Sequence, residues 1–399
     1  MTIPEALIGR LTPEQEMLLL CARTRFGGAD AARAAALAAA GPDWELLLKL
    51  ARAHGVLTLL ARALAGLPGT PAAVVERLAE PAWTVARRSI WLSAELLAVL
   101  ELLTGAGIEA LAYKGPVLGA EAWGDPGLRP FADLDLLVPG ERFAVAADAL
   151  LTAGFEAGGI GAGRQLEAHL AHAWEIELSN GRGLIIDLHR SLVARYLARG
   201  PDAGELFGRS RTVSVDGHSI PTLGRGDTMV AVCLGGASDV WSSLKAIVDV
   251  AELLRAPADW DWPTLLERAH SDGTVRMLLL GVALGCEHAA VPLPEPVAAR
   301  LTAEPKVLEL RQRVWQRLFA RGEAPPAYVE RNRFWLALRD RPGDRVASLW
   351  LRLWTPTLND WRVVQLPDSL YPLYYLVRPV RLAWHALTRW LPEAVRRRG

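Results

Sequence analysis

Cysteine is scarce in this sequence. Only three cysteines occur, they lie far apart, and no two of them form a Cys-x-x-Cys pair; they are Cys21, Cys233 and Cys286. This spacing indicates neither a zinc site nor a disulfide framework. We therefore expect the reducing cytoplasm to be the setting of this protein.

The chain also lacks net charge and long apolar runs. Lys+Arg and Asp+Glu each number 44, which argues against a generic DNA-coating protein. No uninterrupted apolar stretch is long enough to span a bilayer, and the first residues lack the basic start and apolar run of a secretory signal. A hydrophobic content of 51% with 22% charged residues is instead typical of a globular protein with a sizeable core.

The length of 399 residues is enough for two or three domains, and the patterning predicts an α+β fold. We expect a small mixed sheet with helices, embedded between N- and C-terminal helical regions. The predicted units are an N-terminal helical region (1–80), an α/β core (81–225), a helical domain (226–325) and an Arg/Trp/Tyr-rich C-terminal segment (326–399).

Local signals predict the helices. Thr12-Pro13-Glu14-Gln15 combines an N-cap, a proline at the first position and a capping box. Asp43 to His54 reads as a helix closed by Gly55, and a longer helix is expected from about Pro81 to about Thr104. We expect one side of the long helix to carry the apolar residues Trp83, Ile90, Leu97 and Leu100. Further helices are expected over 117–123, 142–153 and 227–320, with a break at Pro325-Pro326.

Alternating patterns predict the strands. One short strand is expected over 107–113, and another carries Asp133 and Asp135. Two more, over 175–178 and 184–189, are separated by the hairpin signal Ser179-Asn180-Gly181. A second hairpin is predicted around Asp216-Gly217, between Val213 and Ile220.

The chemistry of the chain centres on Asp133-Leu134-Asp135-Leu136-Leu137-Val138. Alternate side chains of a strand share a face, so both aspartates project together while the leucines enter a core. Two neighbouring carboxylates repel each other unless a cation lies between them. Mg²⁺, or Mn²⁺ in its place, takes oxygen ligands and also holds substrate phosphates. An isolated Asp-x-Asp is a weak signal, because such spacings are common on solvated strand edges.

A metal-dependent phosphoryl-transfer site needs further groups. Asp187 is the expected third carboxylate, because it ends the apolar run 184–186. His189 lies on the same face and is expected to bind the nucleotide. Glu175 and Glu177 are reserve acids. A two-residue turn at Asn180-Gly181 would pair Trp174 with Asp187, whereas a register shift of one residue would place the glutamates there.

Cations and a glycine upstream of the aspartates are expected to bind the phosphates. Lys114 is the natural phosphate contact, Gly115 lets backbone amides approach, and Arg129 offers a fork of donors. Plainer interpretations remain open for each: Lys114 as a surface cation, Arg129 paired with Asp133 or Asp125, and His189 as a buried structural histidine.

These motifs together resemble the uncharacterised bacterial nucleotidyltransferase family, within the DNA polymerase β-like nucleotidyltransferase superfamily. The resemblance begins with Lys114-Gly115, Arg129-Pro130 and the two-aspartate strand, and continues in Ile186-Asp187-Leu188-His189 and in Trp241 to Asp249. It extends to Asp360-Trp361, Tyr371 to Tyr375 and Arg378-Pro379 in the tail, and so covers about residue 40 to about residue 390. The resemblance implies that the small mixed sheet is of nucleotidyltransferase type. It also implies Mg²⁺, a nucleoside triphosphate such as ATP, and metal binding by Asp133, Asp135 and Asp187.

The predicted function is transfer of a nucleoside monophosphate from the triphosphate to a hydroxyl-bearing small-molecule, peptide or protein acceptor, with release of pyrophosphate. Peptide or secondary-metabolite tailoring is one setting that the resemblance implies. The alternative is a non-catalytic nucleotide-binding regulatory or scaffold protein. It is motivated by Gly115-Pro116 where the superfamily usually has Gly-Ser, and by Gly235 and Asp239 where histidines are expected.

The tail mixes aromatic residues, among them Trp384 and Trp390, with the terminal arginines 396–398. Such a segment can lie on a membrane surface. We expect the aromatic side chains to pack on the core instead, with the terminal arginines solvated.

Overall fold

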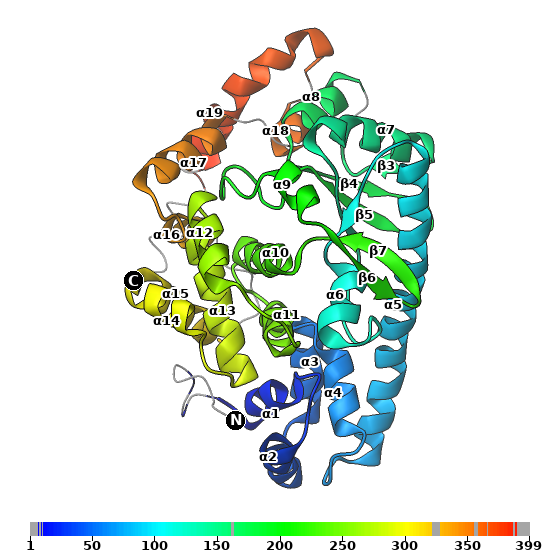
Figure 1. The fold of residues 1–399 in the computed structure, drawn as a ribbon, viewed down its shortest axis with the longest axis vertical. Coiled ribbons are helices and arrows are strands. Elements are labelled where there is room, and N and C mark those ends of the chain that lie inside the picture. Colours follow the sequence, from blue (N-terminus) through cyan, green and yellow to red (C-terminus); the bar gives the residue numbers. More distant parts are fainter. Residues whose placement is uncertain are drawn as a thin grey trace.

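The computed structural model describes residues 7, 9, 11–160, 163–320, 328–354, 358–364, 366–385 and 388. They form the α+β fold expected from the sequence, with a mixed sheet set between helical regions (Figure 1). The expected break at Pro325-Pro326, Trp390 and the terminal arginines lie outside the described residues. No described helix is both long enough and apolar enough to cross a membrane.

Five helices form the N-terminal part. The capping box is confirmed: Thr12 Oγ1 accepts from the Gln15 amide at 3.4 Å, and Gln15 Oε1 accepts from the Thr12 amide at 3.1 Å. Asp43 caps the third helix, since its Oδ1 accepts from the Leu46 amide at 3.0 Å. The bounds are α1 Pro13–Cys21, α2 Gly28–Ala39, α3 Trp44–Ala53, α4 Leu57–Leu64 and α5 Ala72–Gly105.

The long helix α5 differs from the prediction in its start and in its buried face. It begins at Ala72 and contains Pro81, because the good helix formers before the proline outweigh the start signal. Trp83 and Ile90 are 60% and 58% exposed. Leu97 and Leu100 are partly buried and pack against the core cluster that includes Leu92, Leu96, Val99 and Leu103. Only the second half of the expected side therefore faces the core, because a row at heptad spacing drifts around a helix of 3.6 residues per turn.

The main sheet has the order β1-β2-β5-β4-β3. Strands β2 and β5 are parallel, and the other neighbours are antiparallel. The strand expected over 107–113 pairs only at β1, which is two residues long. The bounds are β1 Leu111–Ala112, β2 Leu134–Leu137, β3 Glu156–Ala157, β4 Glu175–Ser179 and β5 Ile185–His189.

The β4–β5 hairpin is confirmed, but its loop is longer than a two-residue turn. Ser179 pairs with Ile185, and the Asn180 side chain accepts from the amides of Arg182 and Leu184. This register places Glu177 opposite Asp187 and Glu175 opposite His189. The glutamates therefore lie on the site face, as the second interpretation expected, but the register differs from that of a two-residue turn by three residues and not by one.

Helices cover one face of the sheet, and the candidate functional residues lie on the other face. Leu134, Leu136, Ile186 and Leu188 join a buried cluster with α5 and with α7 (Phe143–Thr152). Because side chains alternate along a strand, Asp135 and Asp187 project from the opposite face. The remaining elements around the sheet are α6 Gly115–Leu118, π-helix Gly119–Trp123, 3₁₀ helix Gly140–Arg142, α8 Arg164–His172 and α9 Ala203–Gly208.

The second predicted hairpin is confirmed. β6 (Arg211–Val215) and β7 (His218–Thr222) pair Val213 with Ile220. Asp216 and Gly217 both have positive φ, at 49° and 84°. This is the two-residue turn that the right-handed twist of hairpin strands favours.

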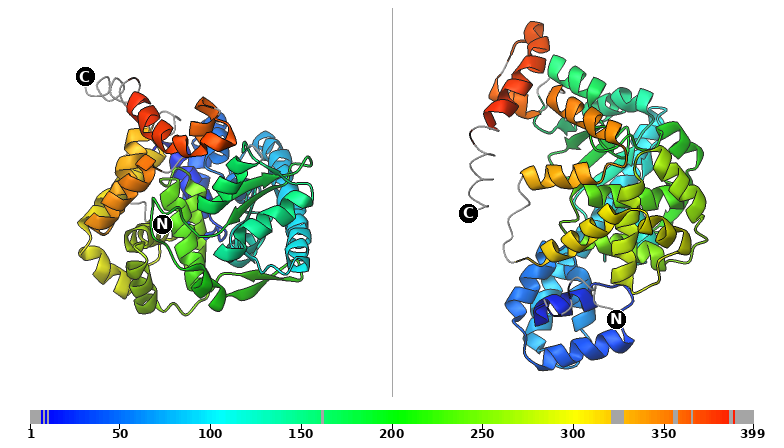
Figure 2. Two further views of the ribbon diagram at one scale, coloured as in Figure 1. Left: turned by 90° about the horizontal axis from the view of Figure 1, so that it is seen from above. Right: turned by 90° about the vertical axis from the view of Figure 1, so that its left-hand side faces the viewer.

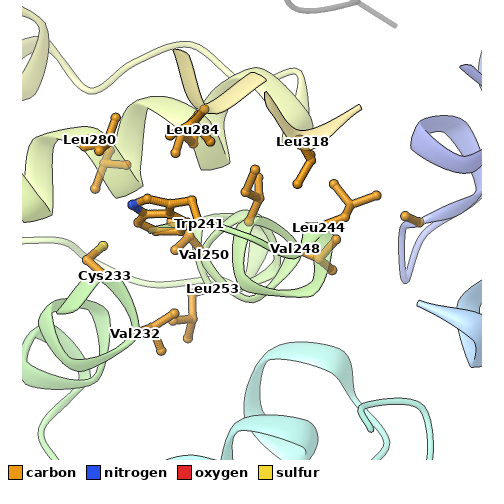
Figure 3. Close-up of a cluster of buried hydrophobic side chains, with 14 of the residues drawn as sticks. Val232, Cys233, Trp241, Leu244, Val248, Val250, Leu253, Leu280, Leu284 and Leu318 are labelled. Atoms are coloured by element: carbon orange, nitrogen blue, oxygen red, sulfur yellow. The ribbon is translucent and has the colours of Figure 1, made fainter. Parts of the chain in front are cut away.

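The helical part after β7 packs around Trp241, which is fully buried among leucine and valine side chains (Figure 3). Its central pair is α11 with α13, and α10 contacts both. The helices expected over 227–320 are confirmed as α10 Arg225–Ser238, α11 Leu244–Arg255, α12 Trp262–Ser271, α13 Val275–Ala289, α14 Glu295–Thr302 and α15 Pro305–Leu318.

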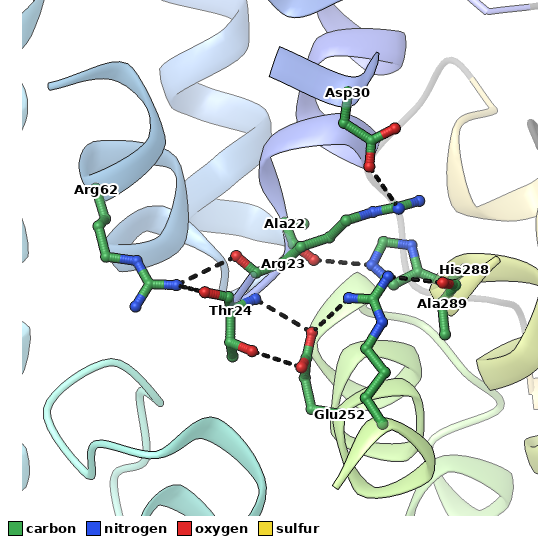
Figure 4. Close-up of polar contacts among 9 residues, drawn as sticks. Ala22, Arg23, Thr24, Asp30, Arg62, Glu252, His288 and Ala289 are labelled. Atoms are coloured by element: carbon green, nitrogen blue, oxygen red, sulfur yellow. Dashed lines mark hydrogen bonds and ion pairs between the residues drawn. The ribbon is translucent and has the colours of Figure 1, made fainter. Parts of the chain in front are cut away.

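Polar contacts fasten the N-terminal helices to this helical part (Figure 4). Glu252 of α11 accepts from the amide and the hydroxyl of Thr24, at 3.1 and 2.5 Å. His288 of α13 contacts the carbonyl oxygen of Ala22 at 2.8 Å. These contacts join both α11 and α13 to the segment that follows α1.

Most of the C-terminal helices lie at the far end of the molecule from α1 and α2, as Figure 1 and the right-hand view of Figure 2 show. They are α16 Tyr328–Ala337, α17 Pro342–Trp354, α18 Leu358–Val363, the 3₁₀ helix Asp368–Leu373 and α19 Tyr374–His385.

Candidate metal and nucleotide site

Two aspartates lie side by side on the open face of the sheet. Asp135 of β2 and Asp187 of β5 are directly paired residues of the two parallel strands. They line a cavity of about 690 Å³, whose opposite wall is formed by α10 and the start of α11. This volume lies within the range of small-molecule sites, roughly 300–1,000 Å³.

His189 completes a compact group with the two aspartates. Each of the three residues Asp135, Asp187 and His189 offers one side-chain ligand atom, and these three atoms lie within 4.8 Å of one another. Asp133 lies one residue before β2 and lines the same cavity, but it is not part of this compact group. The structure thus brings together two of the three predicted metal-binding aspartates, with His189 as the third group.

His189 is buried between aromatic rings. The rings of Tyr113 and Trp174 lie 5.5 and 5.3 Å from its own ring, measured between centroids. Among the described residues, neither ring nitrogen makes a hydrogen bond, although Nε2 lies 3.4 Å from Asp135 and Nδ1 lies 3.6 Å from Glu175. Burial lowers the pKa of His189, against the pull of Asp135, so the ring is neutral and able to coordinate a metal.

Lys114 neutralises one of the two aspartates. Its Nζ lies 2.6 Å from Asp135 Oδ1. Burial alone would raise the pKa of Asp135, but Lys114 and the nearby His189 outweigh it and hold that pKa well below its usual range. Asp135 is therefore ionised throughout the physiological range.

The remaining carboxylates of the cavity would together carry more negative charge than the cations beside them neutralise. Burial, followed by the charges of Asp133 and Asp135, raises the pKa of Asp187 to about 7. Burial and the charge of Asp187 raise the pKa of Glu175 to about 8, although 40% of that side chain is exposed and solvent weakens the effect. Ionising these acids together is therefore unfavourable in free energy, and a bound cation would make it less unfavourable.

Arg129 forms a different pair from those expected. Its Nε and Nη2 donate to the two carboxylate oxygens of Asp249 at 2.8 and 2.9 Å, and Trp123 Nε1 donates to the same carboxylate at 2.9 Å. Asp125 instead accepts from the amide of Gly127. Arg129 still lines the cavity, but two of its five N–H donors are already used.

Gly115 shapes the turn that follows β1. Its φ is +48°, in the region that favours glycine, and a Cβ there would lie 3.5 Å from the Phe131 ring. It begins α6, a helix of only four residues. A role for Gly115 in phosphate binding stays a prediction.

Lys245 is a cavity residue that the residue-level reasoning missed. It lies in the first turn of α11, lines the cavity, and among the described residues has no ion pair. Burial, followed by the charge of Arg129, lowers its pKa to about 8. Its position four residues before Asp249, within the motif of residues 241–249, was the available signal, because that spacing puts both side chains on one face of a helix.

The donor set fits a hard divalent cation. Two carboxylates and a neutral buried imidazole supply oxygen and nitrogen ligands, and the ring nitrogens of His189 lack hydrogen bonds within the described part of the chain. Lys114 occupies only one oxygen of Asp135. Oxygens of both aspartates therefore remain for an ion.

The family model for the Uncharacterised nucleotidyltransferase family matches residues 40–288. The chain belongs to this family. The match takes in every cavity residue named above and well over half of the chain. It ends before the C-terminal helices, so the resemblance seen in the tail motifs stays a prediction, as do bacterial origin and the DNA polymerase β-like superfamily. No curated protein and no solved structure is similar enough to this chain to count as a match.

The departures from the expected motif lie against the site. Gly235 of α10 faces Lys114, since a Cβ there would lie 3.7 Å from Lys114 Cε. Asp239 also lines the cavity, and burial raises its pKa. Both positions, where this nucleotidyltransferase family was expected to carry histidine, are therefore cavity positions.

Proposed function

We propose that this protein transfers a nucleoside monophosphate from a nucleoside triphosphate to a hydroxyl group, and that pyrophosphate leaves. The observation that carries the proposal is the directly paired Asp135 and Asp187 with His189, on the floor of a cavity, in a chain of a nucleotidyltransferase family.

Asp135, Asp187 and His189 would hold a divalent cation, Mg²⁺ or Mn²⁺, with Asp133 able to reach it from the cavity edge. Such an ion neutralises triphosphate charge and polarises the phosphoryl oxygens. The residues of the chain supply position and counter-charge. Lys114 stays beside Asp135 and faces the phosphates, and Lys245 approaches them from the opposite wall.

Arg129 has a supporting role in this proposal. Its two hydrogen bonds to Asp249 join the segment before β2 to α11, so that both walls of the cavity keep their spacing. The N–H donors of Nη1 and the second N–H of Nη2 are the part that could still bind a phosphate.

Asp187 is suited to accept the proton of the acceptor. The acceptor oxygen forms a bond to the α-phosphorus, the bond between that phosphorus and the bridging oxygen breaks, and the hydroxyl proton passes to the carboxylate. The pKa of Asp187 is about 7 without a metal, and the proposed cation would favour the ionised form that accepts the proton. The acceptor would be a small molecule, a peptide or a protein.

The first test is calorimetric binding of the four nucleoside triphosphates with and without Mg²⁺. Asp135→Asn/Asp187→Asn should abolish the Mg²⁺-dependent part of binding. Asp148→Asn is the control, since Asp148 is exposed on α7, on the other side of the sheet. A folded wild-type protein that binds none of the four would refute the proposal.

A second candidate is nucleotide binding without turnover, as in a regulatory or scaffold protein. It is favoured by the engagement of both expected phosphate cations, Lys114 with Asp135 and Arg129 with Asp249. Binding of a triphosphate with no pyrophosphate release under a broad acceptor screen would support this candidate over the first.

A further inference from the structure

The C-terminal helices carry most of the exposed large apolar side chains. Among the described residues, thirteen such side chains lie between 346 and 384, and four lie in all the rest. On α17 they recur at the spacing of one helix face: Val346, Leu349, Trp350 and Leu353. On α19, Val380 and Trp384 are 70% and 66% exposed.

This outward apolar face is not a sign of a poorly packed segment. The carboxylate of Asp360 is fully buried and accepts from Arg378 at 3.0 Å and from Arg381 at 2.5 Å. The Tyr374 hydroxyl donates to the carbonyl of Val364 and accepts from the amide of Leu366. The segment thus buries ion pairs and hydrogen bonds while it turns leucine, valine and tryptophan outward.

The segment is also fixed to the rest of the protein beside the candidate site. The Trp361 ring lies 6.1 Å from the His169 ring of α8, and His169 Nε2 lies 3.0 Å from the carbonyl oxygen of Glu175. α17 and α19 contact each other, and lie together at one end of the molecule (Figure 1). The apolar faces therefore belong to one anchored unit.

The sequence from residue 341 onward differs in net charge from the remainder of the chain. Residues 341–399 contain ten arginines and four acids, a net charge of +6, whereas the whole chain is neutral and residues 1–340 therefore carry −6. Arginine together with exposed tryptophan and leucine suits the boundary between anionic headgroups and acyl chains. A second copy of the same face would bring two +6 segments together, which is unfavourable.

We propose that the surface formed by the exposed apolar side chains of α17 and α19, here called the tail surface, docks on the surface of an anionic lipid bilayer. Trp350 and Trp384 insert at the headgroup level, and the excess of arginine supplies attraction to the lipid phosphates. The expectation that all tail aromatics pack on the core thus holds for Trp361 and Tyr374, which are buried, but is wrong for Trp350 and Trp384.

Co-sedimentation of the full-length protein with vesicles tests this proposal. The vesicles are phosphatidylcholine alone, or phosphatidylcholine mixed with phosphatidylglycerol. We expect binding to the mixed vesicles, weakened by added salt, and little binding to phosphatidylcholine alone. Each inserted large apolar side chain is worth roughly tenfold in partitioning, so Trp350→Ser/Trp384→Ser should weaken binding by about 100-fold.

The matched control is Trp83→Ser/Ile90→Ser. It removes an equally exposed tryptophan and an exposed aliphatic side chain from α5, and should leave vesicle binding unchanged. Far-ultraviolet circular dichroism shows whether either variant is misfolded. Independently of any serine variant, brominated acyl chains should quench part of the wild-type tryptophan fluorescence, and Trp350→Phe/Trp384→Phe should remove that part.

Several results would overturn the proposal: wild-type protein that stays in the supernatant with both vesicles, equal loss of binding in the tail and control variants, or binding without quenching. A vesicle-independent dimer in sedimentation velocity that Trp350→Ser/Trp384→Ser dissolves, without vesicle binding, would overturn it in favour of contact between copies.

Discussion

Arg129 and Asp249 are 120 positions apart in the chain, yet their side chains form two nearly equal hydrogen bonds in the interior of the protein. Both residues are almost fully buried, with 4% and 5% of their side chains exposed. Burial by itself would raise the pKa of Asp249, but Arg129 outweighs it and lowers that pKa. The pair ties the loop before β2 to α11.

We predict that Asp249→Asn lowers the free energy of unfolding by about 3 kcal/mol, because it leaves the Arg129 charge buried without its counter-charge. Chemical denaturation measures this change. Glu45→Gln is the control, since Glu45 pairs with Arg77 on the surface, where an ion pair contributes little. An equal effect of the two substitutions would contradict the structural role of the buried pair.

Lys245 should contribute to triphosphate binding rather than to folding. Lys245→Met removes a cation whose charged form is already disfavoured by burial and by Arg129, so stability should not fall. Triphosphate affinity should fall roughly 10- to 100-fold, the value of one hydrogen bond to a charged group. Calorimetry measures the affinity, and Lys306→Met on α15 serves as control. Unchanged affinity in Lys245→Met would remove this residue from the proposed site.

The local part of the site could be predicted from sequence, and the long-range part could not. The alternation Asp133-Leu134-Asp135-Leu136 correctly predicted leucines in a core and Asp135 on the open face, because strand geometry alone determines this. Asp187 was placed beside Asp135 by the same reasoning. The bonds from Arg129 to Asp249 depend on how α11 packs against the sheet, which no local pattern encodes.

The register of the β4–β5 hairpin was the other feature that the sequence did not determine. Asn180-Gly181 signalled a hairpin, but the Asn180 side chain stabilises a longer loop by accepting two amides. This shift by an odd number of residues exchanges the two faces of β4 and brings Glu175 beside His189. On α5, the predicted apolar side faces the core at Leu97 and Leu100 but not at Trp83 and Ile90, because exposed tryptophan and isoleucine cannot be told from buried ones by sequence.

The pH dependence of metal binding should follow Asp187 and Glu175 as a coupled pair. Their pKa values, about 7 and about 8, are raised above the unfolded values, so the folded protein holds more protons than the unfolded chain. Without metal, stability should therefore fall as pH rises from about 4 to about 8 through these groups. Mg²⁺ relieves the repulsion between the ionised acids, so its stabilising effect should grow over the same interval.

Thermal unfolding at pH 6 and pH 8, with and without Mg²⁺, measures this linkage. We expect the increase in Tm caused by Mg²⁺ to be larger at pH 8 in the wild type. In Asp187→Asn the Mg²⁺ effect should be small at both values. A Mg²⁺ effect that is the same at both pH values in wild type would contradict the assignment of Asp187 to the metal.

Two neighbouring glycines of α10 should respond to alanine in opposite ways. At Gly235 the nearest atom to an added Cβ is Lys114 Cε at 3.7 Å, an ordinary contact. At Gly236 the added Cβ would lie 2.5 Å from the Trp241 ring, which is fully buried and cannot move aside without disturbing the core in Figure 3. Gly235→Ala should stabilise the protein by about 0.5–1 kcal/mol through helix propensity. Gly236→Ala should destabilise it by about 2 kcal/mol through overpacking.

Urea denaturation of both variants measures this difference in the free energy of unfolding. Each variant is the control for the other, because the two glycines are neighbours in the same helix and the substitution is the same. If Gly236→Ala were as stable as Gly235→Ala, the close packing of Trp241 against α10 would be refuted. If Gly235→Ala alone weakened triphosphate binding, the contact between this helix and Lys114 would extend the nucleotide site to α10.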